Sequence, residues 1–220
     1  MSDLCLLLFD CDGTLVDSLG HINGAMDEAF AAAGEPPPGP GALKPLIGLS
    51  LPRVIARLAP RASEATRATL FDEYRAAYTR RASDEAEPLF DGMADALSAL
   101  EGDDTLFGIA TGKSRRGLDR ILTTHGLGER FIVTVSADEA ASKPAPEMVE
   151  IALRTTGAAR ERTVMIGDST LDMTMARSAG VAAVGVSWGS DDPADLRAAG
   201  ALDVAKHPAD LKLLIDGALP

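Results

Sequence analysis

The apolar run from Leu4 to Phe9, closed by two aspartates and a glycine, constrains the fold more than any other stretch of the chain. A continuous Leu-rich run without polar alternation is typical of a central parallel strand that is covered on both faces. Asp10 and Asp12 share a face of that strand end until Gly13 bends the chain. Ligands of open α/β sheets bind beyond the carboxyl ends of strands. Two carboxylates this close repel each other unless a cation lies between them. The pattern therefore predicts a cation site, with an ordinary acidic strand-to-turn junction as the alternative.

Apolar runs and helical patterns alternate from residue 88 onward. We expect strands at 105–110, 131–135, 163–166, 181–186 and 202–204, and helices at 93–100, 114–125, 146–156, 171–179, 194–199 and 209–215. Strands that alternate with helices of this length predict an α/β fold with a doubly wound parallel sheet.

A purely helical segment interrupts this alternation directly after the first strand. Apolar residues at helical spacing run from 22 to 33, a Pro-rich loop covers 35–41, and Ser50 and Ser63 are typical N-caps of two further helices. We therefore expect an α/β core, residues 1–18 and 85–220, with a small all-helical domain, residues 19–84, inserted after the first strand. Because both ends of the insert return to the carboxylates, we expect a lid hinged near residues 17–19 and 85–89.

Composition narrows the possible partners. The chain has 220 residues, 46% of them hydrophobic, which is enough for a sizeable core. A net charge of −12 without a basic cluster argues against nucleic acid and anionic membranes, and no stretch approaches the roughly twenty apolar residues of a membrane span. We expect Cys5 and Cys11 to be buried, reduced thiols, and the protein to be cytoplasmic.

The decamer Phe9–Ser18 resembles the first motif, D-x-D-G-T-[LV]-x-D-[ST], of the haloacid dehalogenase-like (HAD) phosphatases. The resemblance implies a Rossmann-like core and a helical cap of the first type at residues 19–84. About thirty residues separate Thr111 from Lys143, too few for the large cap that other branches of the superfamily carry there.

The segment Thr111-Gly112-Lys113-Ser114 follows a predicted strand and resembles the second motif of the family. It offers hydroxyl and backbone N–H donors at a helix start, as a phosphoryl group requires. The same segment is similar to a Walker A loop, but counting from Gly108 leaves the loop one residue short, which argues against that alternative.

Two further segments match the remaining motifs in the expected order. Lys143, followed by Pro144, would by itself be a solvated loop lysine, but Ser142–Pro146 resembles the K-P-x-P motif of the family. Asp168 and Asp172 match the metal motif G-D-x-x-x-D, although acidic residues at a helix start also serve as caps.

The resemblance implies a role for each motif residue. Asp10 would attack phosphorus to form an aspartyl phosphate, and Asp12 would protonate the leaving alkoxide and then activate water. Mg²⁺ would be held by Asp10, Asp168 and the backbone carbonyl of Asp12, with Asp172 bound directly or just outside. The phosphoryl group would lie among Thr111, Gly112, Lys113, Lys143 and the amides around Cys11 and Asp12. Asp12 argues against dehalogenation, because a leaving halide needs no proton.

The substrate is expected to be a small phosphorylated metabolite. Residues 46–53 resemble the substrate loop of phosphoglycolate phosphatases, and Arg53 would be its cation, with a surface helix arginine as the alternative. A β-phosphoglucomutase-type enzyme is the closest alternative, and it would need a hinge histidine that His21 misses by one residue. A receiver-like phospho-acceptor is the alternative from another class, but receivers are shorter and lack the helical insert. We expect a monomer or a homodimer.

Overall fold

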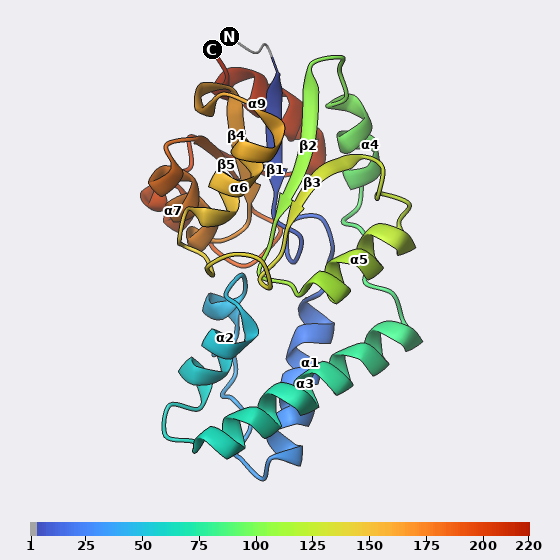
Figure 1. The fold of residues 1–220 in the computed structure, drawn as a ribbon, viewed down its shortest axis with the longest axis vertical. Helices are drawn as coiled ribbons and strands as arrows, with labels where there is room; N and C mark the ends of the chain where they lie inside the picture. Colours follow the sequence, from blue (N-terminus) through green and yellow to red (C-terminus); the bar gives the residue numbers. More distant parts are fainter. Residues whose placement is uncertain (1–3) are drawn as a thin grey trace.

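A six-stranded sheet forms the centre of the fold in the computed structural model, which describes residues 4–220. All five neighbouring strand pairs are parallel, and the strand order is β3-β2-β1-β4-β5-β6. The strands are β1 (Cys5–Phe9), β2 (Thr105–Ala110), β3 (Phe131–Val135), β4 (Thr163–Gly167), β5 (Ala182–Val186) and β6 (Asp203–Ala205). This order confirms the doubly wound parallel sheet that the sequence predicts (Figure 1).

Helices cover both faces of the sheet, which explains why β1 lacks polar alternation. On one face, Cys5, Leu7 and Phe9 pack with α4 (Met93–Ala99), α5 (Arg115–Thr124) and α9 (Leu211–Ala218). On the other face, Leu6 and Leu8 pack with α6 (Glu147–Thr156), α7 (Thr170–Ala179) and α8 (Pro193–Ala199). Side chains that point to both sides of β1 are therefore buried.

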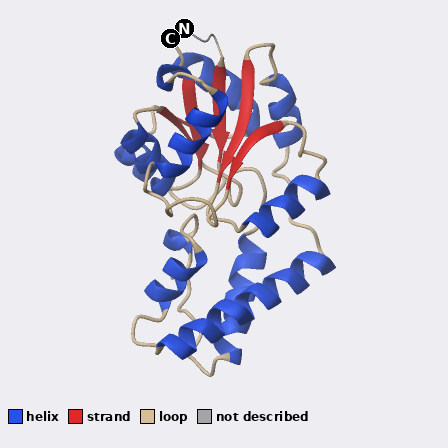
Figure 2. Cartoon of the chain, in the orientation of Figure 1, coloured by secondary structure: helices blue, strands red, loops and turns tan. Residues whose placement is uncertain are grey.

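Residues 19–84, called the helical block below, lie beyond the carboxyl ends of the strands (Figures 1 and 2). They form α1 (Leu19–Ala32), the 3₁₀ turn η1 (Lys44–Leu46), α2 (Leu51–Leu58) and α3 (Glu64–Asp84). The block has a hydrophobic cluster of its own, which includes Met26, Phe30, Ile55 and Leu70. Its helices follow β1 and precede α4 and β2 in the chain.

The two segments that join the helical block to the sheet lie side by side. Val16 and Leu89 form an antiparallel bridge, the amide of Asp17 donates to the carbonyl of Pro88 at 2.9 Å, and that of Phe90 donates to Leu15 at 3.1 Å. Both ends of the block therefore start from one place next to the end of β1.

Several predicted boundaries were off by one to three residues. The last strand runs from Asp203 to Ala205 instead of 202–204, because Leu202 is 64% exposed while Ala205 is buried in register with Val186. The helix expected at 209–215 is divided into η3 (Pro208–Asp210) and α9, and a further 3₁₀ turn, η2 (Arg160–Arg162), precedes β4.

The expectations for Ser63 and for burial of the two cysteines are confirmed. Ser63 is an N-cap whose hydroxyl accepts a hydrogen bond from the amide of Thr66 at 3.1 Å, whereas the N-cap hydroxyl of Ser50 makes no such bond. Cys5 and Cys11 are buried free thiols. Between residues 4 and 220, each helix is too short or too polar to cross a membrane.

Candidate active site

The candidate site lies at the carboxyl ends of β1 and β4, which are neighbours in the sheet. Chains leaving these two strands turn in opposite directions, and such a reversal of strand order opens a crevice for ligands. Asp10 directly follows β1, and Asp168 directly follows β4. The amide of Asp10 donates to the carbonyl of Ile166 at 2.9 Å, so the two strand ends are held together.

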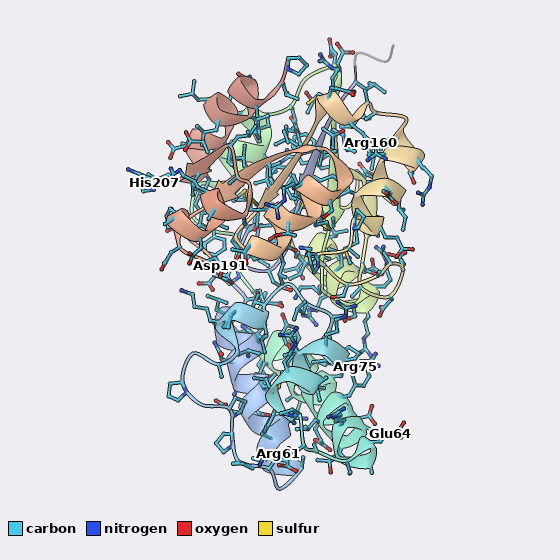
Figure 3. All side chains as sticks on the ribbon, turned by 90° about the vertical axis from the view of Figure 1, so that its left-hand side faces the viewer. Arg61, Glu64, Arg75, Arg160, Asp191 and His207 are labelled. Atoms are coloured by element: carbon cyan, nitrogen blue, oxygen red, sulfur yellow. The ribbon has the colours of Figure 1, made fainter. Side chains whose placement is uncertain are left out.

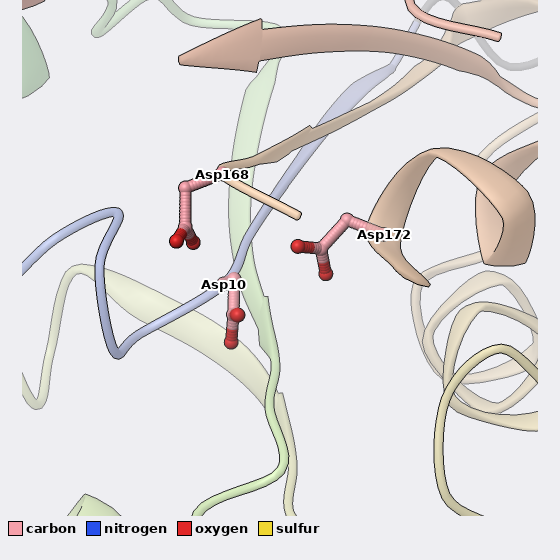
Figure 4. Close-up of side chains that lie close together, drawn as sticks. All are labelled: Asp10, Asp168 and Asp172. Carbon is pink, nitrogen blue, oxygen red and sulfur yellow. The ribbon is translucent and has the colours of Figure 1, made fainter. Parts of the chain in front are cut away.

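Three buried carboxylates meet in this crevice (Figure 4). Asp10, Asp168 and Asp172 each offer an oxygen within 4.8 Å of the others. Asp172 is in the first turn of α7, where its side chain and that of Ser169 form a capping box. Asp172 therefore caps α7 and also belongs to the group of three buried carboxylates.

Lys143 lies between two of these carboxylates and is fully buried. Its Nζ is 2.9 Å from Oδ1 of Asp10 and 2.6 Å from Oδ1 of Asp172. Burial alone disfavours the ammonium, but the two carboxylates raise the pKa of Lys143 above its ordinary value. The alternative of a solvated loop lysine was wrong. Asp10, Asp168, Asp172 and Lys143 are called the carboxylate cluster below.

The carboxylate cluster carries an excess of negative charge, since three carboxylates face one ammonium. Burial and the charges of Asp172 and Asp168 raise the pKa of Asp10, although Lys143 opposes this shift. Burial and the charge of Asp172 likewise raise the pKa of Asp168. Mutual repulsion of this kind in a buried site is the electrostatic condition that a bound cation relieves.

Thr14 and Ser190 both contact Asp168, and neither was predicted as a site residue. The hydroxyl of Thr14 donates to Oδ1 of Asp168 at 2.8 Å, and the amide of Ser190 donates to Oδ2 at the same distance. Thr14 belongs to the predicted decamer and could have been named. Ser190 follows β5 in a stretch that carries no recognisable pattern, so the sequence offered no signal for it.

The predicted phosphoryl-binding residues lie next to this cluster. Thr111 is fully buried, and its hydroxyl accepts a hydrogen bond from the amide of Lys113 at 3.2 Å. Cys11 is also fully buried, and its amide donates to Oδ1 of Asp10 at 2.7 Å. Gly112 lies beneath the helical block, where an added Cβ would come 2.4 Å from the carbonyl oxygen of Gly48. Only glycine permits this close approach.

A second group of charged residues joins the sheet to the helical block. Nζ of Lys113 is 2.8 Å from Oδ1 of Asp12 and 2.7 Å from the hydroxyl of Tyr78 on α3. The Tyr78 hydroxyl donates in turn to Glu87, which also accepts from Arg120 at 3.1 Å. We call Asp12, Tyr78, Glu87, Lys113 and Arg120 the junction cluster.

The centre of the junction cluster, formed by Lys113 and Glu87, is nearly closed to solvent, whereas the Asp12 and Arg120 side chains are 13% and 26% exposed. The side chain of Lys113 is 6% exposed and that of Glu87 is 1% exposed. Burial disfavours the Lys113 ammonium, yet Asp12 and its other neighbours raise its pKa well above the ordinary value. Oδ1 of Asp12 has no hydrogen-bond partner among the described residues, so the ion pair with Lys113 compensates its burial. Asp12 thus points away from the carboxylate cluster.

Arg53 lies outside the cavity that its neighbours line. This residue is exposed on α2, and it does not line the cavity between helical block and sheet, whereas its neighbours Pro52 and Val54 do. Its side chain follows the outer face of a short helix. The contact of this segment with the sheet is instead made by Ser50, whose amide donates to the hydroxyl of Ser142 at 2.9 Å.

These observations define what the site can do. A buried carboxylate with a lysine beside it and two further carboxylates are suited to transfer of an anionic group with a hard cation, since such cations prefer oxygen ligands. Asp12 lines the cavity between the helical block and the strand ends.

Comparison with known proteins agrees with this chemistry. Residues 7–186 match the haloacid dehalogenase-like hydrolase family. The probable phosphatase IndB of Dickeya dadantii is 34% identical, over 88% of this chain and 86% of its own. The N-acetylmuramic acid 6-phosphate phosphatase of Pseudomonas putida is 30% identical, over 97% and 96%. The phosphoglycolate phosphatase of Xylella fastidiosa is 32% identical, over 83% and 80%.

The fold is also similar to that of solved structures. A hydrolase from Pseudomonas syringae superposes with a TM-score of 0.87 at 27% sequence identity, covering 98% of this chain and all of its own.

Proposed function

Because this chain belongs to the haloacid dehalogenase-like hydrolases, we propose that it is a Mg²⁺-dependent phosphatase that cleaves a small phosphomonoester through an aspartyl phosphate on Asp10. The observation that carries this proposal is the carboxylate cluster, in which Lys143 touches the carboxylate of Asp10 at the end of β1. A structural ion pair alone would not need three buried carboxylates around one lysine.

In the first half-reaction, an oxygen of Asp10 forms a bond to phosphorus while the bond from phosphorus to the leaving oxygen breaks. Lys143, Thr111 and backbone amides compensate the negative charge that builds up on the phosphoryl oxygens. Asp12 gives its proton to the leaving alkoxide.

In the second half-reaction, Asp12 takes a proton from water, and the water oxygen attacks phosphorus. The bond between phosphorus and Asp10 breaks, which releases phosphate and restores the Asp10 carboxylate. One residue therefore serves as acid and then as base. Its position at the border of the cavity supports both roles, since leaving group and water arrive from that side.

The donor set fits Mg²⁺. Asp10, Asp168 and Asp172 present only carboxylate oxygens, which a hard cation prefers, and their excess negative charge is what a divalent ion would compensate. When bound, Mg²⁺ would screen the approach of an anionic nucleophile to an anionic phosphate. The backbone carbonyl of Asp12 remains a predicted further ligand.

We further propose that the helical block, residues 19–84, is a cap that closes over the core, residues 1–18 and 85–220. The paired connecting segments support this, because motion at Val16 and Leu89 would move the whole block. Closure would exclude water from the acyl phosphate until the leaving group has departed.

The substrate is proposed to be a phosphorylated metabolite, because similar proteins are named as phosphatases of phosphoglycolate and of N-acetylmuramic acid 6-phosphate. These two leaving groups differ greatly in size. A cytoplasmic location and assembly as monomer or homodimer stay predictions.

The two alternatives receive no specific support. A ring nitrogen of His21 lies 2.9 Å from the backbone carbonyl of Glu85, which engages that histidine with the connecting segment, so no observation favours the phosphomutase. A receiver-like phospho-acceptor would have no use for the helical block.

Hydrolysis of p-nitrophenyl phosphate with Mg²⁺ tests the proposal. Asp10→Asn should lower kcat by at least about a thousandfold, because the nucleophile is lost. Asp27→Asn, a change at an exposed aspartate of α1, is the matched control and should leave the rate unaltered. Turnover that survives Asp10→Asn would contradict the mechanism.

A further inference from the structure

A cavity of about 700 Å³ lies between the helical block and the strand ends. Asp12, Gly112 and Lys113 line it on the sheet side, whereas Asp10 does not reach it. The proposed acid therefore lines the cavity, whereas the proposed nucleophile, two residues earlier in the chain, lies outside its lining. A phosphoryl group attacked by Asp10 would place its leaving group past Asp12, inside the cavity.

The cavity is present although the helical block contacts the core on both sides of it. On one side, the amide of Ser50 donates to Ser142, and the carbonyl of Gly48 lies tightly over Gly112. On the other side, the hydroxyl of Tyr78 is 2.7 Å from Nζ of Lys113. Block and sheet thus touch on both flanks while the space between them persists.

Most of the wall that the helical block contributes is apolar. Leu46, Leu49 and Leu51 come from the segment around η1 and α2, and Phe71 and Tyr74 from α3; all five are partly exposed and line the cavity. An apolar wall gains from covering by an apolar ligand surface, and pockets of about 300–1,000 Å³ suit ligands of drug size. A group as small as glycolate would leave most of this wall in water.

Two arginines that make no ion pair in the described part of the chain add positive charge to the same cavity, which Asp72 and Asp138 also line. Arg75 on α3, which Figure 3 labels, and Arg116 on α5 line it, and within residues 4–220 neither makes an ion pair. Two other lining arginines differ in this respect, since Arg80 pairs with Glu28 and Arg120 with Glu87. The guanidinium of Arg75 lies 5.4 Å from the ring centre of Phe71, so charge and apolar wall are adjacent.

We infer that the leaving group is bulky, with an apolar body against the helical block and a second anionic group, such as a carboxylate, near Arg75 and Arg116. The inference rests on the proposed phosphatase function and sharpens it. It excludes phosphoglycolate as the preferred substrate, because phosphoglycolate has the carboxylate without the body.

Three phosphate esters of primary alcohols test the apolar body and the second anionic group of the leaving group separately. They are phosphoglycolate, 2-naphthylmethyl phosphate and 6-carboxy-2-naphthylmethyl phosphate. We expect kcat/KM to rise in that order, by about tenfold at each step. A kcat/KM for phosphoglycolate that equals or exceeds the values for both naphthyl esters would overturn the inference.

Variants test the anionic contact. Arg75→Gln and Arg116→Gln should each bring the kcat/KM ratio of the carboxylated to the plain naphthyl ester toward one, mainly through KM. Arg61→Gln, an exposed arginine outside the cavity that Figure 3 also labels, is the matched control and should keep the ratio. A ratio that both cavity variants leave unaltered would contradict the contact.

Hydrolysis of p-nitrophenyl phosphate distinguishes failure of this inference from failure of the proposed function. If that activity depends on Asp10 while the naphthyl esters are not preferred, the inference fails and the proposed function stands. If p-nitrophenyl phosphate is not hydrolysed at all, both fail.

Discussion

The two buried charge clusters use the same kinds of side chain and differ in their balance. In the carboxylate cluster, three aspartates face one lysine, whereas in the junction cluster Asp12 and Glu87 face Lys113 and Arg120. Each lysine pairs with one aspartate of the D-x-D stretch, Lys143 with Asp10 and Lys113 with Asp12.

This difference in charge balance indicates which cluster needs a further ion or ligand. A balanced buried network satisfies its own charges and serves to hold elements together, while an unbalanced one needs an ion or an anionic ligand to complete it. The carboxylate cluster is built from the α/β core alone, whereas the junction cluster includes Tyr78 from the helical block. The proposed cation site and the attachment of the block thus lie in two neighbouring clusters, and Asp12, the proposed acid, belongs to the second.

The largest expected effect comes from removing one lysine at a time. Lys113→Met leaves Asp12 and Glu87 buried without their ammonium, and the free energy of unfolding should fall by about 3–5 kcal/mol with or without Mg²⁺. Lys143→Met should lose a similar amount without Mg²⁺ and clearly less with it, because the ion restores positive charge. Urea unfolding at matched ionic strength measures both. If Mg²⁺ changed the free energy of unfolding of both variants by the same amount, the proposed difference between the two clusters would be contradicted.

The proposed acid should matter in proportion to the leaving group. In Asp12→Asn, the first turnover of an alkyl phosphate should slow by about 10²- to 10⁴-fold. That of p-nitrophenyl phosphate should slow far less, because its leaving group departs without a proton. Stopped-flow kinetics resolves the first turnover from later ones. Glu87→Gln, the comparison variant in the same cluster, should cost less than tenfold on both esters, and equal losses in Asp12→Asn would argue against an acid.

Mg²⁺ should stabilise the folded protein through the unbalanced cluster only. At a hundredfold excess over its Kd, Mg²⁺ should add about 2.7 kcal/mol to the free energy of unfolding. Asp168→Asn should lose most of this gain, and Glu87→Gln should keep it. Thermal unfolding with and without MgCl₂ checks the expectation, which fails if Asp168→Asn responds like the unchanged protein.

The smallest expected effect is the pH dependence of the junction cluster. Burial favours the protonated form of Glu87, but Lys113, Tyr78 and Arg120 together lower its pKa below the ordinary value. A lowered pKa in the folded state contributes stability above the unfolded pKa of about 4.3, and this is lost as the pH falls through the folded pKa. Between pH 5 and pH 3, part of this contribution should disappear.

The free energy of unfolding of Glu87→Gln, measured in urea, should fall less between pH 5 and pH 3 than that of the unchanged protein, because this contribution is missing. Glu85→Gln, a change at an exposed glutamate of the same connecting segment, is the control and should behave like the unchanged protein. Identical acid sensitivity of Glu87→Gln and Glu85→Gln would remove Glu87 from the account.

The contrast also marks how far the sequence could predict the site. Asp10, Lys143 and Asp168 follow strands that are adjacent or nearly so in a parallel sheet, so local pattern and topology bring them to one edge. The junction cluster joins residues 12, 78, 87, 113 and 120, and its geometry depends on how the helical block packs against the sheet. No local pattern encodes that packing. Tyr78 and Glu87 could therefore not be predicted, and Arg53 was predicted from resemblance and lies outside the cavity.

The central claim is that Asp10 carries the phosphoryl group between the two half-reactions. Asp12→Asn should retain the first half-reaction with p-nitrophenyl phosphate and slow the second, since its water lacks a base. Mass spectrometry of this variant, quenched during turnover with Mg²⁺, should therefore find a phosphoryl adduct on Asp10, and none in Asp10→Asn. An adduct on another residue, or turnover by Asp12→Asn at the unchanged rate without any adduct, would contradict the account.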